Sequence, residues 1–243
     1  MANVYVVGIG PGAYEQMTMK AYDVLKHCDV LIGYTVYIDL IKEYFPGKRY
    51  VTTPMTQEVR RCEMAYEEAL NGNHTAMICS GDAGIYGMAS LMYELKPKYP
   101  EVEIAVIPGV TAANAGAAVL GAPLNHDFAV ISLSDLLTPY DLIMERVKKA
   151  AEADFAICLY NPSSKKRHDY LKKACEQILK FRSPETVCGM VRNIGREGED
   201  MQVMTLSKLQ KTEVDMFTTV YIGNSRTKQI DYKMVTPRGY RGV

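Results

Sequence analysis

The sequence predicts an α/β protein with two domains, each a β-sheet packed against helices. Short apolar segments alternate with helical patterns along the first half of the chain, which is typical of a mostly parallel sheet. Near the end of the chain, strand-like segments follow one another with little helix between them, so the second sheet is expected to be mixed. The segment 121–127 interrupts the alternation and divides an N-terminal domain, 1–123, from a C-terminal domain, 124–243.

The first half contains strand-like segments that are short, largely apolar and bounded by turn residues, at 4–7, 30–32, 50–52, 75–79 and 102–107. Helical patterns lie between or after them at 17–27, 58–70, 85–95 and 111–120. The clearest helix is 58–70, where apolar residues recur at helical spacing: Val59, Cys62, Ala65, Tyr66, Ala69 and Leu70. Asn71-Gly72-Asn73 then provides a glycine-containing stop.

The second half repeats this alternation after residue 127. Strands are expected at 128–133, 155–160, 186–191, 202–205 and 218–222. Helices are expected at 140–151 and 165–180.

The composition is that of a soluble cytoplasmic protein. Lys plus Arg and Asp plus Glu number 28 each, so no global field favours nucleic acid or an anionic membrane. The N-terminus lacks the pattern of a secretory signal, and no apolar segment is long enough to span a bilayer. Six scattered cysteines without a C-x-x-C pair are expected to be buried thiols rather than disulfides or metal ligands. We therefore expect no metal.

A glycine-rich loop, Gly8-Ile9-Gly10-Pro11-Gly12, follows the first strand. A nicotinamide-binding fingerprint is disfavoured, because Pro11 removes a backbone N–H that a pyrophosphate would use. The second strand also lacks an acidic residue at its end, since its only carboxylate, Asp29, stands at its start. A tight turn without any ligand is the alternative for this loop.

Two further glycine-containing loops follow later strands. One is Cys79-Ser80-Gly81-Asp82-Ala83-Gly84-Ile85-Tyr86-Gly87, and the other is Ile107-Pro108-Gly109-Val110-Thr111-Ala112-Ala113. In an open α/β sheet, ligands bind beyond the carboxyl ends of the strands. Glycines at these ends permit close approach of the backbone. The three loops are therefore expected to converge on one ligand.

This set of loops, G-x-G-P-G, GD-x-x-x-YG and PG-x-T-A in this order, resembles the tetrapyrrole methyltransferase family. The resemblance implies two αβα domains with S-adenosylmethionine in a cleft between them, and a homodimer. By motif position it implies cofactor contacts from Gly10, Pro11, Ser80, Gly81, Asp82, Ile85, Thr111 and Ala112 in the first domain. In the second domain it implies contacts from Tyr160, Asn161, Asn193 and Gly195.

Motifs of the second half resemble one group of that family, the enzymes that methylate C17 of precorrin-3B or cobalt-factor III and contract the ring. These motifs are Ile131 to Pro139, Leu159 to Arg167, Gly223 to Thr227 and Thr236 to Tyr240. The resemblance covers essentially the whole chain. Alternatives are C11 or C20 methylation of a related macrocycle, the related methylation of ribosomal RNA ribose, and a nicotinamide-dependent oxidoreductase. The neutral net charge and the Leu-Tyr-Asn-Pro motif disfavour the RNA substrate.

Methyl transfer from a sulfonium requires alignment of nucleophile and donor rather than a nucleophilic side chain. Ring contraction also requires proton transfers, for which Asp135, Ser132 and His126 are the acid or base candidates. Ser134 and Asp127 are neighbours of these groups. Asp135 could instead cap the following helix, and His126 could bond a backbone carbonyl in the linker.

The acetates and propionates of a tetrapyrrole call for cationic partners, and arginine suits bidentate binding of carboxylates. Our candidates for substrate binding are Lys165, Lys166, Arg167, Arg192, Arg196 and Arg226. For 165–167 the alternative is a solvated helix start. Cations at a helix N-terminus oppose the helix dipole, however, which favours a functional reason for them.

Overall fold

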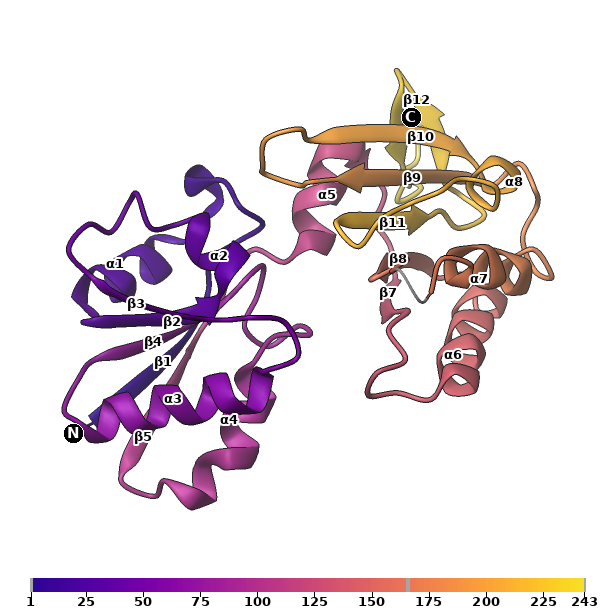
Figure 1. The fold of residues 1–243 in the computed structure, drawn as a ribbon. Helices are drawn as coiled ribbons and strands as arrows, with labels where there is room; N and C mark the ends of the chain where they lie inside the picture. Colours follow the sequence, from indigo (N-terminus) through magenta and orange to yellow (C-terminus); the bar gives the residue numbers. More distant parts are fainter. Residues whose placement is uncertain (1, 165–166, 243) are drawn as a thin grey trace. The chain divides into compact units, whose positions relative to one another are not determined.

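The structure is a computed structural model that describes residues 2–164 and 167–242. The chain forms two compact units, residues 1–112 and 113–243 (Figure 1). Each unit has its own sheet and its own hydrophobic core. Among the described residues, none of the helices combines the length and apolar character needed to cross a membrane.

The first unit contains a five-stranded, fully parallel sheet in the order β3-β2-β4-β1-β5. Its strands are β1 (Ala2–Gly8), β2 (Val30–Tyr34), β3 (Arg49–Thr53), β4 (Thr75–Cys79) and β5 (Val102–Ile107). Gly8 pairs with Cys79 and Val7 with Ile107, so the carboxyl ends of β1, β4 and β5 lie at one edge. The mostly parallel first sheet predicted from the sequence is confirmed.

Helices cover both faces of this sheet (Figure 1). On one face lie α1 (Met19–His27) and α2 (Thr35–Asp39), which bury Ala21, Leu25 and Ile38. On the other face lie α3 (Glu58–Leu70) and α4 (Ala89–Leu95). Two 3₁₀ turns, η1 (Tyr14–Gln16) and η2 (Lys96–Lys98), complete the unit. Because both faces are covered, strands such as β4 are buried along their whole length.

The second unit contains a mixed five-stranded sheet in the order β10-β9-β11-β8-β7. Its strands are β7 (Phe128–Ser132), β8 (Ala156–Tyr160), β9 (Val187–Arg192), β10 (Asp200–Thr205) and β11 (Thr218–Ile222). Only β7 and β8 run parallel, and the other neighbours are antiparallel. A small third sheet joins β6 (Gly121–Ala122), β12 (Lys228–Ile230) and β13 (Lys233–Val235). The mixed sheet is confirmed.

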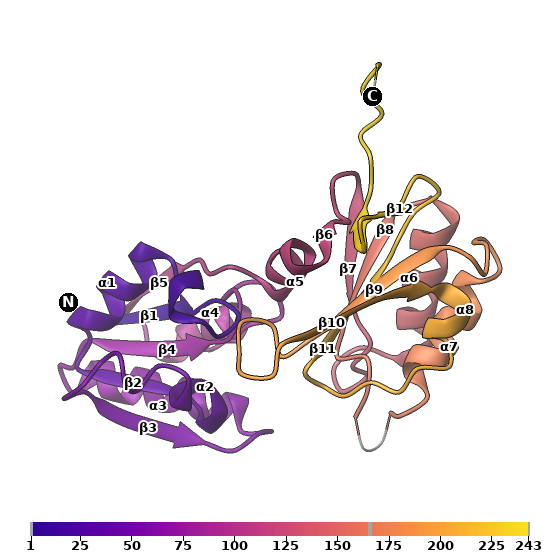
Figure 2. The same cartoon turned by 90° about the horizontal axis from the view of Figure 1, so that it is seen from above.

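Helices α6 (Tyr140–Glu152), α7 (Tyr170–Ile178) and α8 (Leu206–Leu209) pack on one face of the mixed sheet (Figure 2). Helix α5 (Ala112–Leu120) lies against the other face, where Leu120 is within contact distance of the Cβ position of Gly189. The Tyr221 hydroxyl of β11 donates to the carbonyl of Ala113 at 3.0 Å.

These contacts place α5 with the second unit, so the division lies between Ala112 and Ala113 and not at 123/124 as the sequence suggested. The physical reason is burial. Helix α5 buries Ala113, Ala115, Gly116, Ala117 and Leu120. The small residues of α5 did not indicate its domain in the sequence, because a helix of small residues can pack closely against either sheet.

Two predicted helices start later than expected. Helix α4 begins at Ala89 instead of residue 85, because 84–87 remain in the loop after β4. A Cβ at Gly87 would lie 2.3 Å from the carbonyl oxygen of Ala83, so this loop is closely packed. Helix α7 begins at Tyr170, not at 165, so the argument from cations at its N-terminus does not apply. The short elements α2, α8, β6, β12 and β13 were not predicted.

The tight contact of α5 with β11 gives a test of the second unit. A Cβ at Gly116 would lie 2.3 Å from the Tyr221 hydroxyl oxygen. We expect Gly116→Ala to destabilise the protein by about 1–3 kcal/mol through overpacking, despite the higher helix propensity of alanine. Urea denaturation measures this, with Asn114→Ala on the exposed side of α5 as control. Equal or greater stability of Gly116→Ala would contradict the packing described.

Candidate functional site

The three glycine-containing loops meet at the carboxyl edge of the first sheet. Gly10 and Gly81 form a two-way backbone bridge, in which Gly10 N–H donates at 3.1 Å and Gly81 N–H donates at 2.7 Å. Ile9 N–H also donates to the Cys79 carbonyl at 2.9 Å, which extends the pairing of β1 and β4 into the loops. The convergence expected from the sequence is therefore present within the first unit.

Hydrogen bonds to the Asp82 carboxylate connect the second loop with the third. Its Oδ1 accepts hydrogen bonds from the N–H groups of Gly84, at 2.7 Å, and Ile85, at 3.1 Å. Its Oδ2 accepts from Gly109 N–H at 2.9 Å. The carboxylate thus receives three backbone donors from two loops, which is an internal role that the sequence motif did not indicate.

The glycines in these loops are required by close backbone approach. A Cβ at Gly109 would lie 2.2 Å from the carbonyl oxygen of Gly81, and one at Gly8 would lie 2.7 Å from the same atom. Gly81 itself has φ +69°, with no atom closer than 3.7 Å to its Cβ position. Gly8 and Gly109 therefore allow the loops to pack, whereas Gly10 and Gly81 allow the backbone to turn.

The other first-unit residues predicted to hold a cofactor have different exposures. Thr111 is buried and Ala112 is half-buried at the start of α5, while Ile85 is exposed on the loop after β4. Pro11 is buried and Ser80 is half-buried. All lie in the three loops that meet at this edge.

In the second unit, Tyr160 ends β8 opposite Ser132, the last residue of β7, and Asn161 follows it. The Tyr160 hydroxyl accepts from Ala113 N–H at 2.6 Å, so it supports the N-terminus of α5. Asn161 has φ +51° and its Nδ2 donates to Ser132 Oγ at 2.9 Å. A non-glycine residue in the left-handed region indicates a position fixed by its surroundings.

Asn193 and Gly195 form the turn between β9 and β10. Asn193 has φ +52° and Gly195 has φ +65°. The Gly195 N–H donates to Glu199 Oε2 at 2.7 Å, so this donor is already used within the turn. The Asn193 amide reaches the carbonyl of Glu197 at 3.4 Å.

A polar network connects the loop after β7 with the start of α7. Arg167 Nη1 donates to Ser134 Oγ at 2.7 Å and to Asp135 Oδ1 at 3.2 Å. The Tyr170 hydroxyl donates to Asp135 Oδ2 at 2.7 Å. Ser132 Oγ also accepts from Ser134 N–H at 3.2 Å. The network brings the predicted residues Ser132, Asp135, Asn161 and Arg167 together.

Hydrogen bonds in this network favour the ionised form of Asp135. The hydrogen bond from Tyr170, followed by the one from Arg167, lowers the pKa of the Asp135 carboxyl below its ordinary value. The expected alternative, a helix cap, is wrong, because α6 begins at Tyr140 with Pro139 in the cap position and no side-chain cap. Tyr170 was missed from the sequence, since a tyrosine in an amphipathic helix normally indicates core packing.

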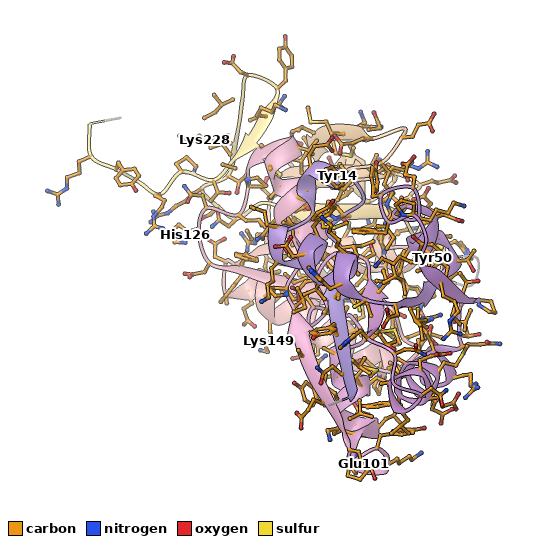
Figure 3. The ribbon with its side chains drawn as sticks, turned by 90° about the vertical axis from the view of Figure 1, so that its left-hand side faces the viewer. Tyr14, Tyr50, Glu101, His126, Lys149 and Lys228 are labelled. Atoms are coloured by element: carbon orange, nitrogen blue, oxygen red, sulfur yellow. The ribbon has the colours of Figure 1, made fainter. Side chains whose placement is uncertain are left out.

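The remaining predicted residues lie apart from this network in the chain. His126 lies in an exposed bend before β7 (Figure 3). Its Nδ1 is 3.7 Å from Asp127 Oδ2. Within the described part of the chain, its side chain forms no hydrogen bond to a backbone carbonyl. Arg192 Nε donates to Asp215 Oδ2 at 2.7 Å. The backbone N–H of Arg226 donates to Asn224 Oδ1 at 3.0 Å. Lys165 and Lys166 lie outside the described residues.

The six cysteines are free and buried, as expected. Burial raises the pKa of the Cys79 thiol to about 11 and that of the Cys28, Cys62 and Cys175 thiols to about 12. It raises the pKa of Cys158 and Cys188 as well. These thiols are therefore packing groups and not nucleophiles.

Known proteins resemble this chain along nearly its whole length. Residues 3–210 match the family model of the Tetrapyrrole (Corrin/Porphyrin) Methylases. A probable cobalt-factor III C(17)-methyltransferase of Salmonella typhimurium is 45% identical, over 97% of this chain and 98% of its own. The cobalt-factor III methyltransferase of Priestia megaterium is 43% identical, and the match spans only 45% of that longer protein. The crystal structure of the methyltransferase CobJ superposes with a TM-score of 0.90 at 32% identity, covering 98% of this chain and all of that one.

The role of Asp82 can be tested by Asp82→Asn. An amide offers one acceptor oxygen and turns N–H donors toward a backbone donor, so either Gly109 or the Gly84 and Ile85 pair loses its acceptor. We expect the free energy of unfolding to fall by about 1–3 kcal/mol. Chemical denaturation measures the change, with Asp23→Asn on the exposed face of α1 as control. A variant as stable as the control would remove Asp82 from this role.

The lowered pKa of Asp135 predicts a pH-dependent contribution to stability. A carboxyl with a lowered folded pKa stabilises the protein above its unfolded pKa, about 3.9 for aspartate, and loses this contribution as pH falls through the folded pKa. Asp135→Asn should therefore be less stable than wild type at neutral pH, with the difference shrinking as the pH falls toward the folded pKa. Urea denaturation between neutral pH and pH of about 3 tests this. The exposed Glu213→Gln is the control, and a difference that persists unchanged in acid would contradict the assignment.

Proposed function

Since the chain belongs to the tetrapyrrole (corrin/porphyrin) methylases, we propose that it is a cytoplasmic S-adenosylmethionine-dependent methyltransferase of cobalamin biosynthesis. Its reaction is methylation of C17 of cobalt-factor III or precorrin-3B with contraction of the ring. The observation that carries this proposal is the joined edge of three glycine loops in a chain that matches the Salmonella typhimurium relative from end to end.

The first-unit edge fits a zwitterionic sulfonium donor better than a dinucleotide. Backbone groups dominate it, Pro11 removes one donor, and the nearby carboxylate of Asp82 already accepts hydrogen bonds from three backbone N–H groups. In our proposal Gly10, Pro11, Ser80, Gly81, Ile85, Thr111 and Ala112 contact the donor. Asp82 acts by holding the loops in place. From the second unit we retain Tyr160, Asn161, Asn193 and Gly195 as cofactor contacts.

When bound, S-adenosylmethionine supplies an activated methyl group, so the chain need only orient the acceptor carbon and exclude water. The loops are suited to this task because their conformations are fixed by hydrogen bonds within the unit. Rigid binding loops reduce the entropy lost on reaching the reactive geometry.

For ring contraction we propose Ser132 and His126 as the groups that exchange protons with the substrate. Asp135 was a candidate of the same kind, but its lowered pKa makes it a poor proton donor at neutral pH. Its bonds to Arg167 and Tyr170 suit it better to positioning the loop that carries Ser132 and Ser134. Deprotonated Asp135 can still act as a weak base. If Asp135→Asn keeps wild-type conversion to the ring-contracted product, Asp135 takes no part in the proton transfers.

For the substrate carboxylates we retain Lys165, Lys166, Arg167, Arg192, Arg196 and Arg226. Arg167 and Arg192 already bind Asp135 and Asp215, so a substrate carboxylate would share or displace these partners. We further propose a homodimer, without nucleic acid or membrane partners.

Methylation at C11 or C20 remains the alternative within the family, and a nicotinamide-dependent oxidoreductase the alternative from another class. Anaerobic incubation with S-adenosylmethionine separates the substrates and positions. We expect cobalt-factor III or metal-free precorrin-3B to gain one methyl group at C17 and to contract, as read by mass spectrometry and NMR. A methyl group at another carbon would reassign the activity.

Ligand binding provides the simpler test of class. S-adenosylhomocysteine at about 100 times its Kd should stabilise the fold by about 2.7 kcal/mol and raise the melting temperature, because it binds only the native state. NAD at the same concentration is the control and should leave the melting temperature unchanged. Stabilisation by NAD and not by S-adenosylhomocysteine would overturn the proposal.

A further inference from the structure

Arg61 is a buried cation without a carboxylate partner. It lies in the first turn of α3 and is only 4% exposed. Its Nε donates to Thr53 Oγ1 at 2.7 Å and its Nη2 donates to the Pro54 carbonyl at 2.9 Å. Both acceptors are neutral, and Arg61 forms no ion pair with any carboxylate among the residues that the structure describes.

The other buried arginine of the described chain is neutralised. Arg182 is 8% exposed and pairs with Asp154, and its remaining nitrogens donate to the carbonyls of Ala151 and Phe155. Burying an unpaired charge costs far more than burying a paired one. Among the described residues, Arg61 is therefore a buried arginine whose hydrogen-bond acceptors are all neutral.

Acidic residues are available on the same helix, yet they bind elsewhere. Glu63 and Glu67 both pair with Arg60, at 3.8 and 2.6 Å. Glu58 Oε1 accepts from the Thr56 N–H at 3.2 Å. On α3, the exposed Arg60 is thus paired with carboxylates, whereas the buried Arg61 donates only to neutral acceptors.

Arg61 lies at the same edge of the sheet as the glycine loops. Thr53 is the last residue of β3 and pairs with Tyr34, the last residue of β2. Strand β2 in turn pairs in parallel with β4, with Ile32 opposite Met77, so β3, β2 and β4 end at the same edge. The hydrogen bond to Thr53 therefore holds the guanidinium at the edge where the loop containing Ser80, Gly81 and Asp82 begins.

We propose that Arg61 is a binding residue for a ligand carboxylate, and that this carboxylate is a peripheral acetate or propionate of the tetrapyrrole. The inference rests on the proposed function. Nε and Nη2 donate to Thr53 and Pro54, and Nη1 donates to no group among the described residues, so Nη1 can donate to a carboxylate at this edge. The same chemistry would suit the carboxylate of the methyl donor, so the experiment must separate the two sources.

The experiment measures the dissociation constants of cobalt-factor III and of S-adenosylhomocysteine for the full-length protein. Arg61→Gln removes the charge and Arg61→Lys keeps the charge but not the planar fork. The matched control is Arg60→Gln, one residue away and exposed. We expect Arg61→Gln to weaken cobalt-factor III binding by about tenfold or more, as expected for loss of a charged hydrogen bond. Arg61→Lys should be weakened less, and Arg60→Gln should bind as wild type does.

The S-adenosylhomocysteine measurement identifies the source. An unchanged affinity for it in Arg61→Gln assigns the carboxylate to the tetrapyrrole, whereas selective loss of this affinity assigns it to the methyl donor. If both affinities match wild type, or if both fall together, Arg61 is structural and the inference is overturned. Should Arg61→Gln fail to fold, Arg61→Lys is read by the same criteria. Wild-type protein that binds neither ligand would overturn the proposed function as well.

Discussion

In the first unit, the conformation of two loops depends on one carboxylate that accepts hydrogen bonds from their backbone N–H groups. Asp82 receives N–H groups from Gly84, Ile85 and Gly109, and so connects the ends of β4 and β5. The Gly10–Gly81 bridge adds the end of β1. Loops that carry ligand contacts normally lose order easily, because few buried contacts hold them. Here charge-assisted hydrogen bonds replace those contacts.

In the second unit, hydrogen bonds between side chains hold a loop in place. The loop after β7 is held by Ser132, Ser134 and Asp135, which bind Asn161, Arg167 and Tyr170. Because several partners converge on it, the ion pair between Asp135 and Arg167 belongs to a network and is more than an isolated surface pair. Leu136 and Leu137 follow directly, and Leu137 is 98% exposed. This loop therefore exposes the apolar side chains of Leu136 and Leu137 directly after residues that hydrogen bonds hold in place.

Sequence patterns were sufficient for most strands and for the convergence of the loops, because alternation and glycine spacing are local signals. They were insufficient for α5, whose small residues do not indicate which sheet they pack on. The motif containing Asp82 was recognisable, but its use as an internal acceptor depends on Gly109, which is distant in sequence. Arg61 and Tyr170 were missed for the same reason, since helical spacing does not indicate which tertiary partners a side chain lacks or gains.

The burial of all six cysteines has a practical consequence for spectroscopy and labelling. Maleimides and spin labels react with thiolates, and the native thiols are shielded from solvent and poorly ionised at neutral pH. A cysteine introduced at a surface position such as Leu137 would be the only rapidly reacting thiol among the described residues. Fluorophores can thus be attached to either unit of the native protein without first constructing a cysteine-free background.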